Sequence, residues 1–189
     1  MGTLSYTATV SIDGLAADAD GDFQWSAPGE DVFRFHIERM NDVSAEILGR
    51  RTYQLMRYWE AEPDPSEEVW GDEEREFARR WCELDLVVAS STLDEAELGA
   101  DARLIRDLGL EEIQRIAAGA TGEVEIFGPT TAAPAIREGL VRDFRFFVVP
   151  KIVGGGLRAI PEDARLDLEL VEQRVFDNGA VLLHYRQRT

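Results

Sequence analysis

The feature that most constrains the fold is the alternation of short apolar runs with longer amphipathic segments along most of the chain. The apolar runs are rich in Val, Ile, Phe and Thr, which is typical of buried strands. The segments between them place apolar residues three or four positions apart, as in helices packed on a sheet. The expected strands are Leu4–Ile12, Ser44–Leu48, Leu84–Ala89, Val124–Phe127, Phe144–Val149, Leu166–Phe176 and Val181–Arg186; the expected helices are Asp31–Asn41, Arg51–Trp59, Asp72–Cys82, Leu110–Ala118 and Thr130–Glu138.

This order predicts a three-layer α/β/α domain with a mixed, mostly parallel central sheet covered by helices on both faces. The last two strands are joined through Asp177-Asn178-Gly179, and Asn-Gly between β-prone runs favours an antiparallel hairpin. The chain shows no internal repeat and no linker, so we expect one domain over residues 1–189.

The composition restricts the kinds of molecule that the protein is expected to bind. Asp and Glu number 37 against 20 Lys and Arg, a net charge of -17, so the surface repels nucleic acids and anionic membranes. No apolar run approaches the roughly 20 residues that span a bilayer, and Met1–Val10 lacks the features of a signal peptide. The single cysteine, Cys82, and two isolated histidines give no metal-ligand spacing. We therefore expect a cytoplasmic protein without a bound metal.

Three expected strands end alike, in Gly or hydroxyl residues followed by a helix or loop. The segments are Gly49-Arg50-Arg51-Thr52, Ser90-Ser91-Thr92 and Gly128-Pro129-Thr130-Thr131. Ligands gather at the carboxyl ends of parallel strands, and helix N-termini offer free N–H groups to anions. The pattern therefore predicts a site for a phosphate-bearing ligand, although none of the three matches GxGxxG or GxxxxGK. The alternative interpretation is that Arg50-Arg51 is a solvated helix start.

Several motifs, in this order, resemble those of the dihydrofolate-reductase-like superfamily. They are Ser11-Ile12-Asp13-Gly14-Leu15-Ala16, Trp25, Gly49-Arg50-Arg51-Thr52-Tyr53, Val87-Val88-Ala89-Ser90-Ser91-Thr92-Leu93, Ile126-Phe127-Gly128, and the segment from Leu140-Val141 to Gly154-Gly155-Gly156. The likeness covers nearly the whole chain and is closest to the C-terminal reductase domain of the bifunctional riboflavin-biosynthesis deaminase/reductase.

The resemblance implies an NADPH-dependent reductase that passes a hydride to a pteridine- or pyrimidine-like heterocycle, such as the ribosylaminopyrimidine of riboflavin synthesis. It also implies a homodimer, which the Phe144–Val149 strand and the terminal hairpin could support. The chain lacks the zinc-binding His/Cys signature of a deaminase domain. A non-catalytic module for ligand binding or dimerisation that retains the fold is the alternative function.

The resemblance also implies roles for single residues. Backbone around Ala8, Leu15 and Ala16 would contact the nicotinamide. The phosphates would meet Gly49, Arg50, Arg51 and Thr52. The adenosine and its 2′-phosphate would lie near Ser90, Ser91 and Thr92. The pyrophosphate would rest on Gly128, Pro129, Thr130, Thr131 and Ala132. The substrate pocket would be lined by Trp25, Asp31 and Phe35, with Asp31 anchoring the heterocycle and assisting proton delivery.

Two positions depart from the family's pattern. Gly128-Pro129 stands where the family usually has two glycines; proline suits the first helical position, but it lacks an N–H that could bind phosphate. Both Glu30 and Asp31 sit near the expected pocket carboxylate. We prefer Asp31 because Phe35 then falls one turn later on the same helical face, while a plain helix-start acid remains the alternative.

Overall fold

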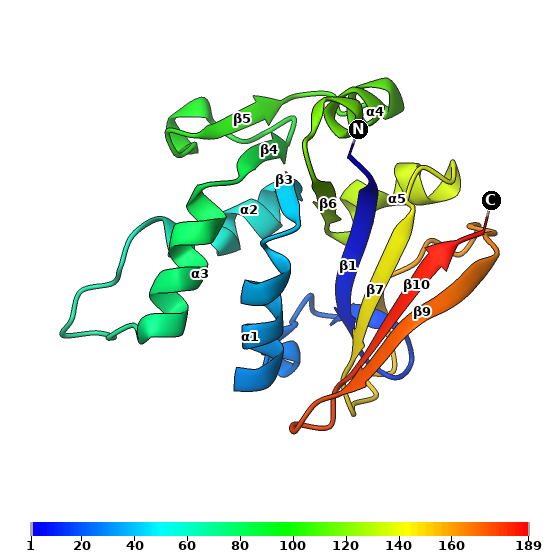
Figure 1. The fold of residues 1–189 in the computed structure, drawn as a ribbon, viewed down its shortest axis with the longest axis horizontal. Coiled ribbons are helices and arrows are strands. Elements are labelled where there is room, and N and C mark those ends of the chain that lie inside the picture. Colours follow the sequence, from blue (N-terminus) through cyan, green and yellow to red (C-terminus); the bar gives the residue numbers. More distant parts are fainter. Residues whose placement is uncertain (1, 189) are drawn as a thin grey trace.

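The computed structural model describes residues 2–188 and centres on an eight-stranded sheet with the order β5-β4-β3-β6-β1-β7-β10-β9 (Figure 1). The strands from β5 to β7 in this order run parallel, and β10 pairs antiparallel with β7 and with β9. Their bounds are β1 Leu4–Val10, β3 Val43–Gly49, β4 Asp85–Ala89, β5 Ala102–Ile105, β6 Glu123–Phe127, β7 Asp143–Val148, β9 Leu168–Val175 and β10 Val181–Gln187. The mixed, mostly parallel sheet with a C-terminal hairpin is thus confirmed.

Helices cover both faces of this sheet. One face packs on α4 and α5 through a core that includes Ile113 and Ile136, and the other packs on α1, α2 and α3 through a core that includes Tyr53 and Trp81. Strand β3 shows the alternation directly, because Ile47 faces the first core and Leu48 faces the second. The helix bounds are α1 Glu30–Arg39, α2 Arg50–Met56, α3 Asp72–Cys82, α4 Leu110–Gly119 and α5 Pro129–Arg137, with 3-10 turns at Gln24–Ser26, Arg57–Glu60 and Glu95–Glu97.

All the strands and helices expected from the sequence pattern are present, but three short strands were missed. Strand β5 was not expected, and β2 (Leu15–Asp18) and β8 (Gly156–Arg158) pair antiparallel in a separate two-stranded sheet. These segments are too short to show a periodicity, and β2 and β8 form only because distant parts of the chain meet. A Cβ at Gly156 would lie 2.2 Å from the carbonyl oxygen of Ala17, so this close approach requires glycine.

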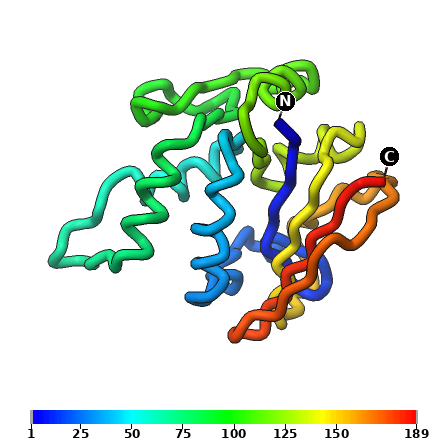
Figure 2. The backbone as a smooth tube through the Cα atoms, in the orientation of Figure 1, coloured from blue at the N-terminus to red at the C-terminus, as the bar shows by residue number. Residues whose placement is uncertain are grey.

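The topology places four strand ends side by side. Because β4, β3, β6 and β1 are parallel neighbours, their carboxyl ends at Ala89, Gly49, Phe127 and Val10 form one row, which we call the strand-end edge. Helices α2 and α5 begin directly after two of these strands. The chain between the Arg57–Glu60 turn and α3 projects away from the sheet (Figure 2). Within residues 2–188, no helix is both long and apolar enough to cross a bilayer.

Candidate functional site

At the strand-end edge, the end of β3 approaches α5 and the residue after β6 approaches α2, and glycine occupies both positions. A Cβ at Gly49 would lie 2.4 Å from Thr131 Oγ1, which is closer than any non-bonded contact allows. Gly128 has a φ of +86°, a left-handed conformation that side chains disfavour, and a Cβ there would lie 3.3 Å from Thr52 Oγ1. The hydroxyls of Thr52 and Thr131 therefore lie beside these two glycines. The edge combines exposed backbone with hydroxyl groups, a combination suited to phosphate oxygens.

Arg50 connects the end of β4 to the ends of β3 and β6. Arg50 Nη1 donates a hydrogen bond to Thr92 Oγ1 at 3.0 Å, which links the end of β3 to the loop after β4. Ser90 Oγ shapes that loop by accepting from the backbone N–H of Thr92 at 3.2 Å and of Leu93 at 3.0 Å. Arg50, Ser91 and Thr92 are exposed, as is Arg51. The structure thus brings the three predicted strand ends together, with two guanidinium groups on an otherwise acidic protein.

The start of α5 keeps donors for an anion despite its proline. Pro129 is the first residue of the helix, where no N–H is needed for helical hydrogen bonding. The N–H groups of Thr130 and Thr131 precede the first helical bond, which runs from Ala132 N to the carbonyl oxygen of Gly128 at 3.0 Å. The methyl group of Ala132 is fully buried in the core. Ala132 therefore anchors the helix, and the two threonines supply the free donors.

The segment after β1 forms the fourth part of the edge. Ser11 N donates to the carbonyl oxygen of Leu15 at 2.9 Å, and Leu15 N donates to Ser11 Oγ at 3.1 Å, closing a tight loop. The pairing of β2 with β8 shifts register between Leu15 and Ala17, which leaves Ala16 outside the ladder. Ala8 lies within β1 and is half-buried against the core under α4 and α5. The segment that follows β1 thus lies next to the end of β6 in the row of strand ends.

The three residues expected to line a substrate pocket gather around one aromatic cluster. Trp25 and Phe35 are both half-buried and pack against a core that contains Phe147 and Phe176. The ring centroid of Phe35 lies 5.7 Å from that of Phe147 and 6.0 Å from that of Phe176, in edge-to-face geometry. Trp25 Nε1 donates to the carbonyl oxygen of Asp22 at 3.0 Å. The cluster joins α1 to the sheet and to the C-terminal hairpin.

The carboxylate of Asp31 is already engaged. Its Oδ2 accepts the backbone N–H of Asp177 at 2.7 Å in the β9–β10 turn, and its Oδ1 accepts the N–H of Val32 at 2.9 Å. Asp31 therefore connects the start of α1 to the hairpin, a contact that could not be anticipated from the sequence. Glu30, the other candidate, is exposed at the first position of the helix.

Sequence reasoning also missed a buried charge cluster between α1 and the sheet. Arg145 contacts both carboxylate oxygens of Glu123, at 2.7 and 3.0 Å, and Arg39 bridges Glu123 and Glu125. Glu46 Oε2 accepts from Trp81 Nε1 at 2.9 Å. Burial, and then the nearby charge of Glu125, raise the pKa of Glu46 to about 8. The sequence feature that could have indicated this charge cluster is the presence of charged residues at alternate positions of otherwise apolar strands.

This cluster continues to the neighbouring strands. Asp143 Oδ1 lies 2.7 Å from His184 Nε2 and 2.8 Å from Arg186 Nη2. Burial alone would raise the pKa of Asp143, but the hydrogen bonds from His184 and Arg186 outweigh it and hold the pKa at about 2. Arg39 ends α1, while Glu123 and Asp143 begin β6 and β7, so this part of the cluster lies away from the strand-end edge. Its pairing is typical of a structural network.

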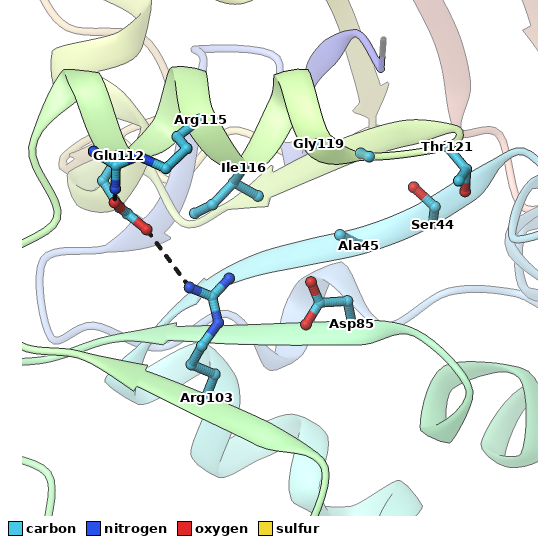
Figure 3. Close-up of a pocket in the computed structure, with 10 residues that line it drawn as sticks. Ser44, Ala45, Asp85, Arg103, Glu112, Arg115, Ile116, Gly119 and Thr121 are labelled. Carbon is cyan, nitrogen blue, oxygen red and sulfur yellow. Dashed lines mark ion pairs between the residues drawn. The ribbon is translucent and has the colours of Figure 1, made fainter.

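A groove of about 360 Å³ also lies at the opposite end of the strands (Figure 3). Its lining includes Ser44 and Asp85 from the starts of β3 and β4, together with Arg103, Glu112 and Arg115. Arg103 Nη1 lies 3.5 Å from Glu112 Oε1, and Arg115 also pairs with Glu112. Within residues 2–188, no group of three or more His, Cys, Asp or Glu side chains is placed to hold a metal ion.

Comparison with known proteins identifies the family. The sequence model of the RibD C-terminal domain matches residues 3–182. The chain belongs to the RibD C-terminal domain family. No curated protein matched the chain.

Solved structures share its fold at low sequence identity. A protein from Shewanella sp. PV-4, described as a riboflavin biosynthesis protein, superposes with a TM-score of 0.75 at 20% identity, with all of both chains covered. RibD from Acinetobacter baumannii gives a TM-score of 0.72 at 15% identity, and the whole chain here spans 58% of that protein. Dihydrofolate reductase from Enterococcus faecalis, solved with NADP(H), gives 0.66 at 17% identity, covering 100% and 98% of the two chains. The dihydrofolate-reductase-like fold is thereby confirmed.

Proposed function

We propose that this RibD C-terminal domain is an NADPH-dependent reductase whose strand-end edge binds the cofactor. The observation that carries the proposal is the convergence of four neighbouring strand ends, with the Arg50–Thr92 contact near one end of the row and the Ser11–Ala16 segment at the other. Neighbouring strands lie about 4.8 Å apart, so four ends span roughly 14 Å, a length that suits an extended dinucleotide. Family membership supports the same assignment.

Each part of the row would meet a different part of the cofactor. Arg50, Arg51, Ser91 and Thr92 would hold the 2′-phosphate end, because guanidinium and hydroxyl groups bind phosphate oxygens. The left-handed Gly128 and the N–H groups of Thr130 and Thr131 would receive the pyrophosphate. Thr52, beside Gly128, adds a hydroxyl. The remaining cofactor-binding residues of the proposal are Ala8, Leu15, Ala16, Gly49, Ser90 and Pro129. Ala132, expected from the sequence to bind the pyrophosphate, has its N–H bonded to Gly128 and its methyl group buried, so its role is to support the start of α5.

The proposed substrate is a pteridine- or pyrimidine-like heterocycle, with the ribosylaminopyrimidine of riboflavin synthesis as the leading candidate. Bound NADPH would supply the hydride. Trp25 and Phe35 would line the apolar wall of the pocket and exclude water. Asp31, which accepts the N–H of Asp177, would accept a hydrogen bond from a ring N–H group and assist the delivery of a proton from solvent to the substrate.

One observation favours a second candidate, a non-catalytic module that binds a nucleotide or another ligand. Both oxygens of Asp31 accept backbone N–H groups, so two of its acceptor positions are already used by Asp177 and Val32. A module of this kind would keep the strand-end edge and bind NADPH without turnover. Consumption of NADPH in the presence of pteridine and pyrimidine substrates would exclude it.

A fluorescence titration with NADPH and NADH tests the reductase proposal. We expect NADPH to bind at sub-millimolar concentration and Arg50→Ala to weaken it about tenfold, because one charge-assisted phosphate contact is lost. Arg79→Ala, which removes an exposed arginine of α3, is the matched control and should bind normally. Failure of the unchanged protein to bind either nucleotide would overturn the proposal, and a clear preference for NADH would remove the 2′-phosphate role of the arginines.

We also propose that the protein forms a homodimer through β9. Its cytoplasmic location remains a prediction from the sequence. The Phe144–Val149 run lies mostly in β7, between β1 and β10, and so offers no free edge. Strand β9 ends the sheet, and its residues 169–175 are all exposed, Val175 by 76%. Antiparallel pairing of two β9 strands about their midpoint would set Glu169 opposite the partner's Arg174 and Leu168 opposite the partner's Val175.

A charge swap tests this interface by analytical ultracentrifugation. We expect the unchanged protein to sediment as a dimer and Glu169→Arg to sediment mostly as a monomer, because two arginines would then face each other at both ends of the pair. The double variant Glu169→Arg/Arg174→Glu should restore the dimer. A monomeric unchanged protein, or a dimer that both variants leave unaltered, would contradict the proposed interface.

A further inference from the structure

Asp13 joins two segments that lie 140 positions apart at the end of β1. Its Oδ2 accepts the backbone N–H of Gly154 at 2.7 Å, and its Oδ1 accepts that of Val153 at 3.2 Å. The side chain thus receives two donors from the turn that follows β7. A carboxylate that accepts two N–H groups is a strong local restraint, because each bond is charge-assisted.

The contacts around Asp13 extend this restraint along both segments. Ile12 N donates to the carbonyl oxygen of Lys151 at 2.7 Å, and Ala159 N donates to that of Gly14 at 3.1 Å. Beyond them, β2 and β8 form the small antiparallel sheet. Gly154 itself has a φ of +80°, so the turn presents its N–H to Asp13 in a conformation that other residues disfavour.

The carboxylate of Asp13 stays charged over the whole working range of pH. The nearby hydroxyl of Ser11, followed by the N–H groups of Gly154 and Val153, lowers the pKa of Asp13 to about 2. Unlike Asp31, Asp13 connects the two segments that form the β1 end of the strand-end edge. No charge of opposite sign pairs with it among residues 2–188, so its contacts there are with backbone and a hydroxyl.

We infer that Asp13 is a positioning residue that holds the 153–156 turn against the 11–16 segment and so fixes the surface for the nicotinamide half of the cofactor. The inference rests on the proposed function, in which Leu15 and Ala16 contact that half. The phosphate-binding half lies on the other strands of the row, at Arg50, Thr92 and Gly128, none of which Asp13 contacts. Loss of the clamp should therefore affect one half of the cofactor and spare the other.

The test compares two probes, NADPH and 2′,5′-ADP, which carries the adenosine phosphates but no nicotinamide. We expect Asp13→Ala to raise the Kd for NADPH about tenfold and to leave the Kd for 2′,5′-ADP within about twofold of normal, since two charged hydrogen bonds to the turn are lost. Asp13→Asn, which keeps one acceptor, should give an intermediate Kd for NADPH. The matched control is Asp64→Ala, because Asp64 likewise accepts a loop N–H, that of Ser66 at 2.8 Å, in the projecting loop.

The outcomes separate the two proposals. If the unchanged protein binds neither NADPH nor 2′,5′-ADP, the proposed function fails. If it binds both and Asp13→Ala binds NADPH normally, the positioning role alone is overturned. Equal weakening of both probes would also overturn it, because it would show a general structural effect. Hydrogen exchange supplies an independent check: the amide of Gly154 should exchange faster in Asp13→Ala, and unchanged exchange would contradict the clamp.

Discussion

The substitution Glu46→Gln removes a buried carboxyl group that lies close to a second acid, Glu125. Glu46 lies in β3 and is only 2% exposed, with Trp81 Nε1 as its hydrogen-bond donor and Glu125 as the neighbouring acid. Burial and that neighbouring charge raise its pKa from 4.5 to about 8. At neutral pH the folded protein therefore keeps a proton on Glu46 that the unfolded chain has released. Glutamine keeps an oxygen for Trp81 and removes the titration.

The pH dependence follows from that pKa difference. Below pH 4.5 both states are protonated, and the titration of Glu46 does not change the free energy of unfolding. As the pH rises from 4.5 to about 8, only the unfolded chain loses the proton, so stability falls; above about 8 the effect is constant. At about 1.36 kcal/mol per pH unit, the full loss is on the order of 5 kcal/mol.

Urea unfolding at several pH values between 5 and 8, followed by tryptophan fluorescence, measures this loss. We expect the difference in unfolding free energy between Glu46→Gln and the unchanged protein to grow by several kcal/mol in favour of the variant across this range. Glu111→Gln, which alters an exposed acid of α4, is the control and should show no such growth. A difference that stays constant with pH would show that Glu46 is not protonated in the folded protein.

Two further predictions concern other parts of the fold. Asp143→Asn should lower the unfolding free energy at pH 7 by about 3 kcal/mol in urea, because it leaves the contacts with His184 and Arg186 uncompensated. Since the folded pKa of Asp143 is depressed, its contribution is present above pH 3.8 and is lost as the pH falls toward 2; equal acid sensitivity of both proteins would contradict this. Gly49→Ala should cost about 1–3 kcal/mol and weaken NADPH binding, because its Cβ would displace Thr131. The control is Gly119→Ala, where a Cβ would meet open space, and it should leave the unfolding free energy in urea unchanged or raise it. Equal losses of unfolding free energy in the Gly49 and Gly119 variants would contradict the close contact between Gly49 and Thr131.

The sequence predicted the elements whose patterns are long and local. The Asp72–Cys82 helix has the bounds expected from its Phe77 and Trp81 spacing. The three strand ends were predicted to form one site for a phosphate-bearing ligand, which requires them to lie together. The Gly49–Thr131 and Arg50–Thr92 contacts show that they do. The ligand that this edge binds stays a prediction.

The contacts that could not be predicted from the sequence depend on pairing between distant segments. The contacts of Asp13 with the 153–154 backbone and of Asp31 with Asp177 arise only once the chain has folded. The buried charges of Glu46 and Arg145 were missed for a related reason. Hydrophobic periodicity takes account only of apolar residues. These charged residues are tolerated in the interior because residues from other strands and helices form hydrogen bonds and ion pairs with them.

A crystal structure of the protein soaked with NADPH would show where the cofactor binds. We expect the dinucleotide to stretch across the carboxyl ends of β4, β3, β6 and β1, with its 2′-phosphate beside Arg50 and Thr92 and its nicotinamide at Leu15 and Ala16. Density for the nucleotide in the groove between Ser44 and Arg115, at the opposite end of the strands, would contradict it.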